Sequence, residues 1–190
     1  MPNQFVPRLT SDGIAGNPLY YSKNPFWRSG WGMPNCTCYA WGRFWEVYGP
    51  DADYSNPPML STSDAEDWYG FNDGYTRSQT PALGAIWCGA DGIYSGLGHV
   101  GVVEEIAANG DLTISNSGLN AYYWQLDTIT AASGYQWPHG NYRFQGFILC
   151  PGYGPGPGPG PGPGPGPGPT ESGFRPWMAK HIIDKRRCGY

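Results

Sequence analysis

The clearest pattern in the chain is an apolar stripe at helical spacing. Its positions lie four residues apart: Ala40, Phe44 and Tyr48. Asn35 can cap the first turn, and Gly49-Pro50 can end the last one. The pattern therefore predicts an amphipathic helix over residues 36–48.

A second, shorter helix is expected to begin at Ser63. Glu66 stands three residues later, and the pair has the spacing of a capping box. Residues 1–34 are rich in Pro, Gly, Asn and aromatic residues, so we expect them to be mostly loop.

Beyond residue 80 the pattern changes from helix to strand. The apolar and β-branched runs are Ala85–Cys88, His99–Ile106, Leu112–Ser117 and Tyr142–Cys150. The turn dipeptide Asn109-Gly110 lies between the second and third runs and predicts a hairpin. The sequence thus predicts an α+β fold in which a helix packs on an antiparallel sheet.

A Pro-Gly alternation divides the chain. It is uninterrupted from Pro155 to Pro169, and proline removes the backbone donor at every second position, so neither helix nor sheet can form there. Fully extended, these residues would reach about 45 Å. We expect a folded domain over 1–150, with its core at about 25–150, a linker over 151–169 and a short tail over 170–190.

Charge is distributed unevenly between these parts. Residues 1–150 hold six Lys or Arg and 13 Asp or Glu, whereas residues 151–190 hold five and two. A formal net charge of −4 gives no indication of a nucleic-acid partner. The basic and apolar tail is interpreted as a docking peptide, a wall anchor or a membrane-surface helix, or as a frayed end.

Targeting signals and a disulfide framework are not expected. The first 15 residues lack an apolar core after a basic start, and no apolar run approaches the roughly 18 residues that span a bilayer. The five cysteines are odd in number, and none forms a CxxC pair, so they predict no metal site. We therefore expect a chain without a signal peptide or a transmembrane segment.

Cys36 is the candidate nucleophile because it stands at the predicted start of a helix. Backbone N–H groups there favour a thiolate and can stabilise an oxyanion. His99 opens a predicted strand after a glycine-rich stretch and is the candidate base. The alternatives are a cysteine that only packs in the core and a histidine that caps a strand.

Three segments closely resemble the CHAP family, the cysteine, histidine-dependent amidohydrolases/peptidases of phage peptidoglycan hydrolases. They are residues 35–43 (NCTCYAWGR), 64–69 (DAEDWY) and 98–105 (GHVGVVEE), and residues 142–148 look like the last strand of the family. The resemblance covers about residues 25–150. It implies a papain-like fold related to NlpC/P60 proteins, cleavage of amide bonds in peptidoglycan, and Cys36 rather than Cys38 as nucleophile.

The resemblance also implies a third catalytic residue that orients the imidazole. Ungapped spacing from His99 places it at Asn116. A two-residue turn in the hairpin would put His99 opposite Asn120, whereas a four-residue loop would put it opposite Gly118 with Asn116 on the diagonal. Asn116 is preferred, and Asn120 stays open.

Further site candidates are an amide and several aromatic side chains. An oxyanion or substrate role is predicted for Asn35, Trp41, Trp87 and Trp124. Some CHAP proteins bind calcium, and several acidic residues could supply oxygen ligands, but none shows EF-hand spacing, so neither a metal nor another cofactor is assigned.

The favoured interpretation is a phage-encoded peptidoglycan hydrolase that cleaves an amide bond as an amidase or an endopeptidase. It would act either as an endolysin, first in the host cytoplasm and then at the wall, or as a virion tail lysin whose tail segment binds other phage proteins. The alternatives are a non-enzymatic wall-binding or tail structural module, and a cytosolic amidohydrolase for small amides.

Overall fold

The fold is known from a computed structural model, which describes residues 5–91 and 97–154. Within these residues no helix is long and apolar enough to cross a membrane. The expected linker beyond residue 154 and the expected tail lie outside them, so the domain boundaries stay a prediction.

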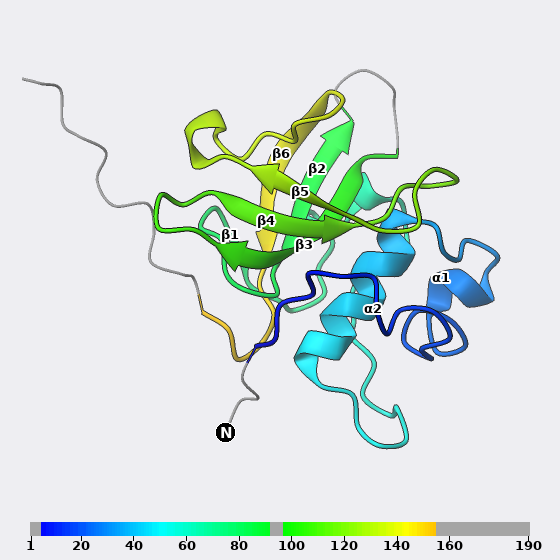
Figure 1. The fold of residues 1–190 in the computed structure, drawn as a ribbon. Coiled ribbons are helices and arrows are strands. Elements are labelled where there is room, and N and C mark those ends of the chain that lie inside the picture. Colours follow the sequence, from blue (N-terminus) through cyan, green and yellow to red (C-terminus); the bar gives the residue numbers. More distant parts are fainter. Residues whose placement is uncertain (1–4, 92–96, 155–190) are drawn as a thin grey trace, which may run out of the picture. The chain divides into compact units, whose positions relative to one another are not determined.

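One antiparallel sheet organises the fold, with α1 and α2 on one side of it (Figure 1). Its strand order is β1-β6-β2-β3-β4-β5. The helical elements are α1 (Pro25–Arg28), α2 (Cys36–Tyr48), η1 (Ala65–Asp67) and η2 (Ala131–Ser133). The strands are β1 (Arg77–Ser78), β2 (Ile86–Asp91), β3 (His99–Ile106), β4 (Leu112–Asn116), β5 (Gln125–Ile129) and β6 (Tyr142–Ile148). The predicted α+β class is confirmed, although α1, β1 and β5 were not foreseen.

The predicted helix over residues 36–48 is confirmed as α2, but it is buried far more completely than an amphipathic stripe implies. Every residue of Cys36–Trp45 is buried. The N-terminal segment covers the side of α2 that faces away from the sheet: a Cβ on Gly42 would lie 2.7 Å from the Tyr20 ring. Since Ile14 and Tyr20 are fully buried, the core extends further toward the N-terminus than residue 25.

The expected capping box at Ser63 is wrong. The helix there is a single 3-10 turn that begins at Ala65, and Asp64 precedes it without a side-chain cap. The Glu66 amide donates instead to the Leu97 carbonyl, across to the segment before β3. This long-range bond replaces the local cap and fixes η1 beside the end of the sheet.

The β3–β4 hairpin sets the register on which the site depends. Ile106 pairs with Leu112, so the loop holds five residues, but a bulge between Val103 and Glu105 shifts the register by one. Val102 consequently pairs with Ser115, the register expected for the four-residue loop. Glu104 is the residue at the bulge. Its buried carboxylate faces α2 and forms an ion pair with Arg43 at 2.8 Å.

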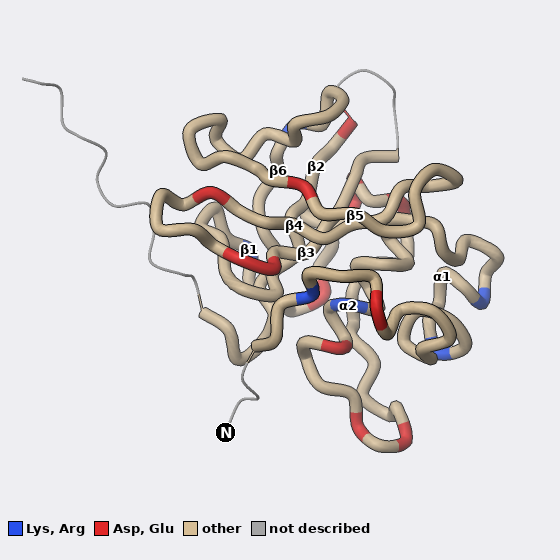
Figure 2. The backbone as a smooth tube through the Cα atoms, in the orientation of Figure 1, with Lys and Arg blue, Asp and Glu red and all other residues tan. Residues whose placement is uncertain are grey.

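Charged residues are spread over the described backbone and do not collect on one element (Figure 2). Acidic residues outnumber basic ones, as the sequence requires. This distribution provides no basic stripe for a nucleic acid.

Candidate active site

Cys36 is the first residue of α2, and its neighbour Asn35 caps the helix. The Asn35 side chain accepts hydrogen bonds from the Thr37 amide at 2.9 Å and the Thr37 hydroxyl at 2.7 Å, and it donates to the Trp31 carbonyl. Its amide is therefore committed to the cap. The N–H groups of the first turn remain the donors that could stabilise an oxyanion.

His99 is the first residue of β3, and Gly98 makes its position possible. Gly98 has φ +62°, and a Cβ there would lie 2.5 Å from the Glu66 nitrogen. The His99 ring is then held by two aromatic rings, Trp137 at 4.5 Å and Tyr142 at 5.3 Å between centroids. Only 5% of His99 is exposed.

The structure brings Asn116 to His99, as preferred. Its Oδ1 lies 3.3 Å from His99 Nε2. Asn120 is instead exposed in a turn with φ 52°, where its backbone N–H donates to the Pro34 carbonyl. Because Nε2 contacts Asn116, Nδ1 is the ring nitrogen left for a proton from Cys36.

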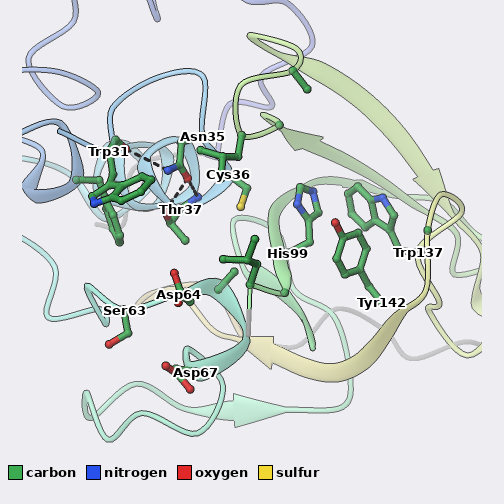
Figure 3. Close-up of a pocket in the computed structure, with 18 of the residues that line it drawn as sticks. Trp31, Asn35, Cys36, Thr37, Ser63, Asp64, Asp67, His99, Trp137 and Tyr142 are labelled. Atoms are coloured by element: carbon green, nitrogen blue, oxygen red, sulfur yellow. Dashed lines mark hydrogen bonds between the residues drawn. The ribbon is translucent and has the colours of Figure 1, made fainter. Parts of the chain in front are cut away.

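Cys36 and His99 line one cavity of about 830 Å³ (Figure 3). The wall combines apolar rings with hydroxyl and carboxylate groups, and the described lining residues include no Lys or Arg. Aromatic residues of the wall are Phe26, Trp31, Tyr122, Trp137 and Tyr142; polar ones are Thr62, Ser63, Asp64, Asp67 and His139.

Burial favours the neutral forms of both Cys36 and His99. It raises the pKa of Cys36 to about 11, against the opposing effect of backbone N–H groups at Val100, Thr37 and Cys36 itself. Burial also lowers the pKa of His99 to about 4, against the effects of Asn116 and Asp127. At neutral pH the resting pair is therefore a thiol beside a neutral imidazole, which is free to accept a proton.

The structure places none of the three predicted substrate tryptophans at the cavity. Trp41 and Trp87 are buried in the core, and Trp87 donates to the Tyr135 carbonyl on the sheet face opposite α2. Trp124 is half-buried and donates to the Tyr39 hydroxyl. The tryptophans at the cavity are Trp31, which is 60% exposed, and Trp137.

The described acidic residues that could supply oxygen ligands to calcium do not form a metal site. Among the described residues, no three His, Cys, Asp or Glu side chains come together in a way that could hold a metal ion. The four described cysteines are free thiols, and Cys38 donates to the Tyr20 carbonyl at 3.4 Å.

Two residues behind His99 were missed from the sequence. The Tyr122 hydroxyl donates to Asn116 Oδ1 at 2.6 Å, and Asp127 Oδ2 accepts from Asn116 Nδ2 at 2.8 Å. The one available signal was the alternation of β5, in which Asp127 and Ile129 share a buried face.

With this geometry in hand, comparison with known proteins gives the class. Residues 24–120 match the CHAP domain, and the chain belongs to this family. It is 35% identical over 146 residues to "Probable autolysin SsaALP" of Staphylococcus aureus (strain NCTC 8325 / PS 47), which covers 70% of this chain and 50% of the relative. The chain thus spans about half the length of that curated relative.

Solved structures show more distant similarity. An N-acetylmuramoyl-L-alanine amidase from Staphylococcus aureus is 23% identical, with a TM-score of 0.43, over 62% of this chain and 32% of the other. The structure of Ly7917 is 19% identical, with a TM-score of 0.43, over 63% of this chain and 55% of the other.

Proposed function

We propose that the chain is a peptidoglycan hydrolase that uses Cys36 as nucleophile, His99 as general base and Asn116 to orient the imidazole. The observation that carries the proposal is the joint position of these residues: Cys36 and His99 open onto one cavity, and Asn116 contacts the far nitrogen of the ring. CHAP membership and the relative named a probable autolysin support bacterial cell wall as the substrate.

The geometry supports a two-stage acyl transfer. Cys36 Sγ attacks the carbonyl carbon of an amide while its proton passes to His99 Nδ1. The N–H groups at the start of α2 stabilise the negative oxygen that forms. His99 then gives the proton to the leaving nitrogen, and water, activated by the same imidazole, hydrolyses the thioester.

The neutral resting pair affects the energetics of this step. Burial opposes a lone thiolate and a lone imidazolium, but attack creates the two charges together, and their attraction offsets part of the cost of each. The thiol is therefore activated when the substrate is in place.

The cavity wall suits a glycopeptide. Trp31 offers an exposed apolar ring on which a sugar face can stack, while Thr62 and Ser63 offer hydroxyl groups for peptide amides. Whether the enzyme is an N-acetylmuramoyl-L-alanine amidase or a cross-bridge endopeptidase depends on which amide reaches Cys36. Phage origin, release as an endolysin and attachment to a virion tail through residues 170–190 are further parts of the proposal.

Digestion of purified cell walls tests the function directly. Fresh protein should clear a wall suspension, and prior treatment with iodoacetamide should stop clearing. Mass spectrometry of the released fragments then identifies the bond: new N-terminal alanine indicates an amidase, and cut cross-bridges indicate an endopeptidase. Wall binding without any released fragment would instead support the non-enzymatic module.

A further inference from the structure

Asp127 is a buried carboxylate directly behind the proposed orienting residue. It lies on β5 opposite Ile114 of β4, so Asn116, two residues along β4, is its diagonal neighbour on the same face. Asp127 is 8% exposed, and its Oδ2 accepts a hydrogen bond from Asn116 Nδ2 at 2.8 Å.

An ionised carboxylate only accepts hydrogen bonds, and this decides which end of the Asn116 amide it holds. The amide nitrogen must point to Asp127, so the oxygen must point to His99 Nε2. The other contacts of the amide restrain it less. Tyr122 has a hydroxyl that can donate or accept, and the Gln125 carbonyl is 3.5 Å from Nδ2.

We propose that Asp127 is a positioning residue that sets the tautomer of His99, an inference that rests on the proposed function of Cys36 and His99. An oxygen facing Nε2 requires the proton on Nε2, which leaves the Nδ1 lone pair free to accept the proton of Cys36. With the amide reversed, its nitrogen would face Nε2, the ring proton would move to Nδ1, and proton transfer from Cys36 would be blocked.

The carboxylate has a second effect during attack. Asn116 separates Asp127 from the imidazole. The negative charge of Asp127 favours the imidazolium that forms when Cys36 loses its proton. The other groups that face Asp127 are Gln125, whose Nε2 donates at 2.6 Å, and the exposed His139, whose Nε2 lies 3.3 Å away.

Asp127→Asn in the full chain is the central test. An amide at position 127 can donate or accept, so it no longer dictates the orientation of Asn116. We expect kcat on solubilised wall fragments to fall about 10- to 100-fold, less than the loss of the base itself, with little change in KM. The matched control is Asp111→Asn, which alters a hydrogen-bonded aspartate in the β3–β4 turn and should leave kcat unchanged.

The tautomer itself can be read without any substrate. In protein labelled with 15N-histidine at pH 7, the His99 signals, assigned by their loss in His99→Gln, should show the proton on Nε2. Asp127→Asn should produce the Nδ1-protonated form, alone or in a mixture, and Asp111→Asn should not.

An exchange of the two side chains provides a rescue that a merely structural role would not allow. In Asn116→Asp combined with Asp127→Asn, the carboxylate at 116 accepts directly from Nε2–H, and the amide at 127 can donate to it. We expect the Nε2-protonated form to return and kcat to recover at least about tenfold over Asp127→Asn.

The outcomes separate this inference from the proposed function. A folded Asp127→Asn that keeps the Nε2-protonated form overturns the positioning role, even if the wild type digests walls. A wild type that digests nothing defeats the proposed function, but the tautomer shift still decides the role of Asp127. If Asp127→Asn does not fold, Asp127→Ser applies the same test with a smaller side chain that also donates and accepts.

Discussion

The two faces of the β3–β4 hairpin carry buried polar networks of different construction. On the side of α2, Glu104 accepts from Arg43 at 2.9 and 2.8 Å and from the Ser115 hydroxyl at 2.6 Å. On the opposite side, His99 contacts Asn116, which is held by Asp127. Because Ser115 and Asn116 are consecutive on β4, alternation along one strand supplies a residue to each network.

The networks differ at their ends. The first is closed, because Glu104 and Arg43 neutralise each other and the pKa of Arg43 is raised, mainly by its hydrogen bond and attraction to Glu104, against its burial. The second is open, because it ends in a neutral imidazole with a free nitrogen at a cavity. The closed network fixes the position of α2 on the sheet. The open network leaves one imidazole nitrogen of His99 able to accept a proton at the cavity.

The largest effect is expected at the open end. Cys36→Ala should abolish wall hydrolysis, because among the described residues no other thiol lines the cavity with His99. Cys38→Ala is the matched control, since Cys38 is buried against the Tyr20 carbonyl and should affect activity little. Clearing of a wall suspension measures both, with circular dichroism to show that both variants fold. Activity near wild type in Cys36→Ala would disprove the mechanism.

The second largest effect concerns the base. His99→Ala should lower turnover about 100- to 10,000-fold, because both proton transfers need the imidazole. His139→Ala should cost far less, since His139 is 70% exposed and lies beyond Asp127. Initial rates on solubilised fragments provide the comparison. Equal losses in the two variants would show that the open network does not end at His99.

The closed network should respond in stability and not in chemistry. Glu104→Gln leaves the Arg43 guanidinium buried with only Glu46 as a charged partner, and we expect unfolding free energy to fall by about 3 kcal/mol. Activity per folded molecule should be largely retained. Urea titration measures the first quantity and rates at low temperature the second. A stable Glu104→Gln with reduced kcat would reverse the assignment of the two networks.

The open network should instead make stability depend on pH. Burial lowers the pKa of His99 from 6.5 to about 4, so below pH 6.5 the unfolded chain takes up a proton that the folded chain refuses. The contribution of His99 to stability is therefore lost as pH falls from 6.5 to 4, by up to about 3 kcal/mol. Urea midpoints across this range, compared with His99→Gln, isolate the effect. A variant with the same slope as wild type would assign it to other groups.

The sequence predicted the networks unequally, for a physical reason. The start of α2 and the start of β3 were predicted because caps, glycines and alternation act locally, and they placed Cys36 and His99. Asp127 was missed because β5 is five residues long and mixes polar and apolar residues on both faces. Its function depends on register with β4, which is a long-range property.

The aromatic residues at the cavity were hard to predict for the same reason. Trp41 is buried and Trp31 is exposed. Tertiary packing decides this difference, and composition does not distinguish the two residues. Trp137 lies at the site in contact with two rings from other segments, Trp87 at 4.8 Å and His99 at 4.5 Å between ring centroids. Pairings between distant segments therefore decided which rings could meet a substrate.

The smallest effect on catalysis is expected from removing the C-terminal residues. Tyr153 packs against Phe5 at 5.7 Å between ring centroids, so a truncation after Gly154 retains this contact. Both networks lie within the residues that remain, and rates on soluble wall fragments should therefore be unchanged. Loss of that activity would mean that the removed residues belong to the catalytic domain.

Binding to intact cells, or incorporation into a particle, should nevertheless drop in the truncated chain. We expect the basic and apolar residues of 170–190 to bind a second partner, and a tethered enzyme has a higher effective concentration near that partner. Cosedimentation with cells or virions measures this. The matched control keeps the full length and replaces the basic residues of the tail by Gln: Arg175, Lys180, Lys185, Arg186 and Arg187. If neither variant binds less than the wild type, residues 170–190 attach the enzyme to nothing, and the virion-tail proposal loses its support.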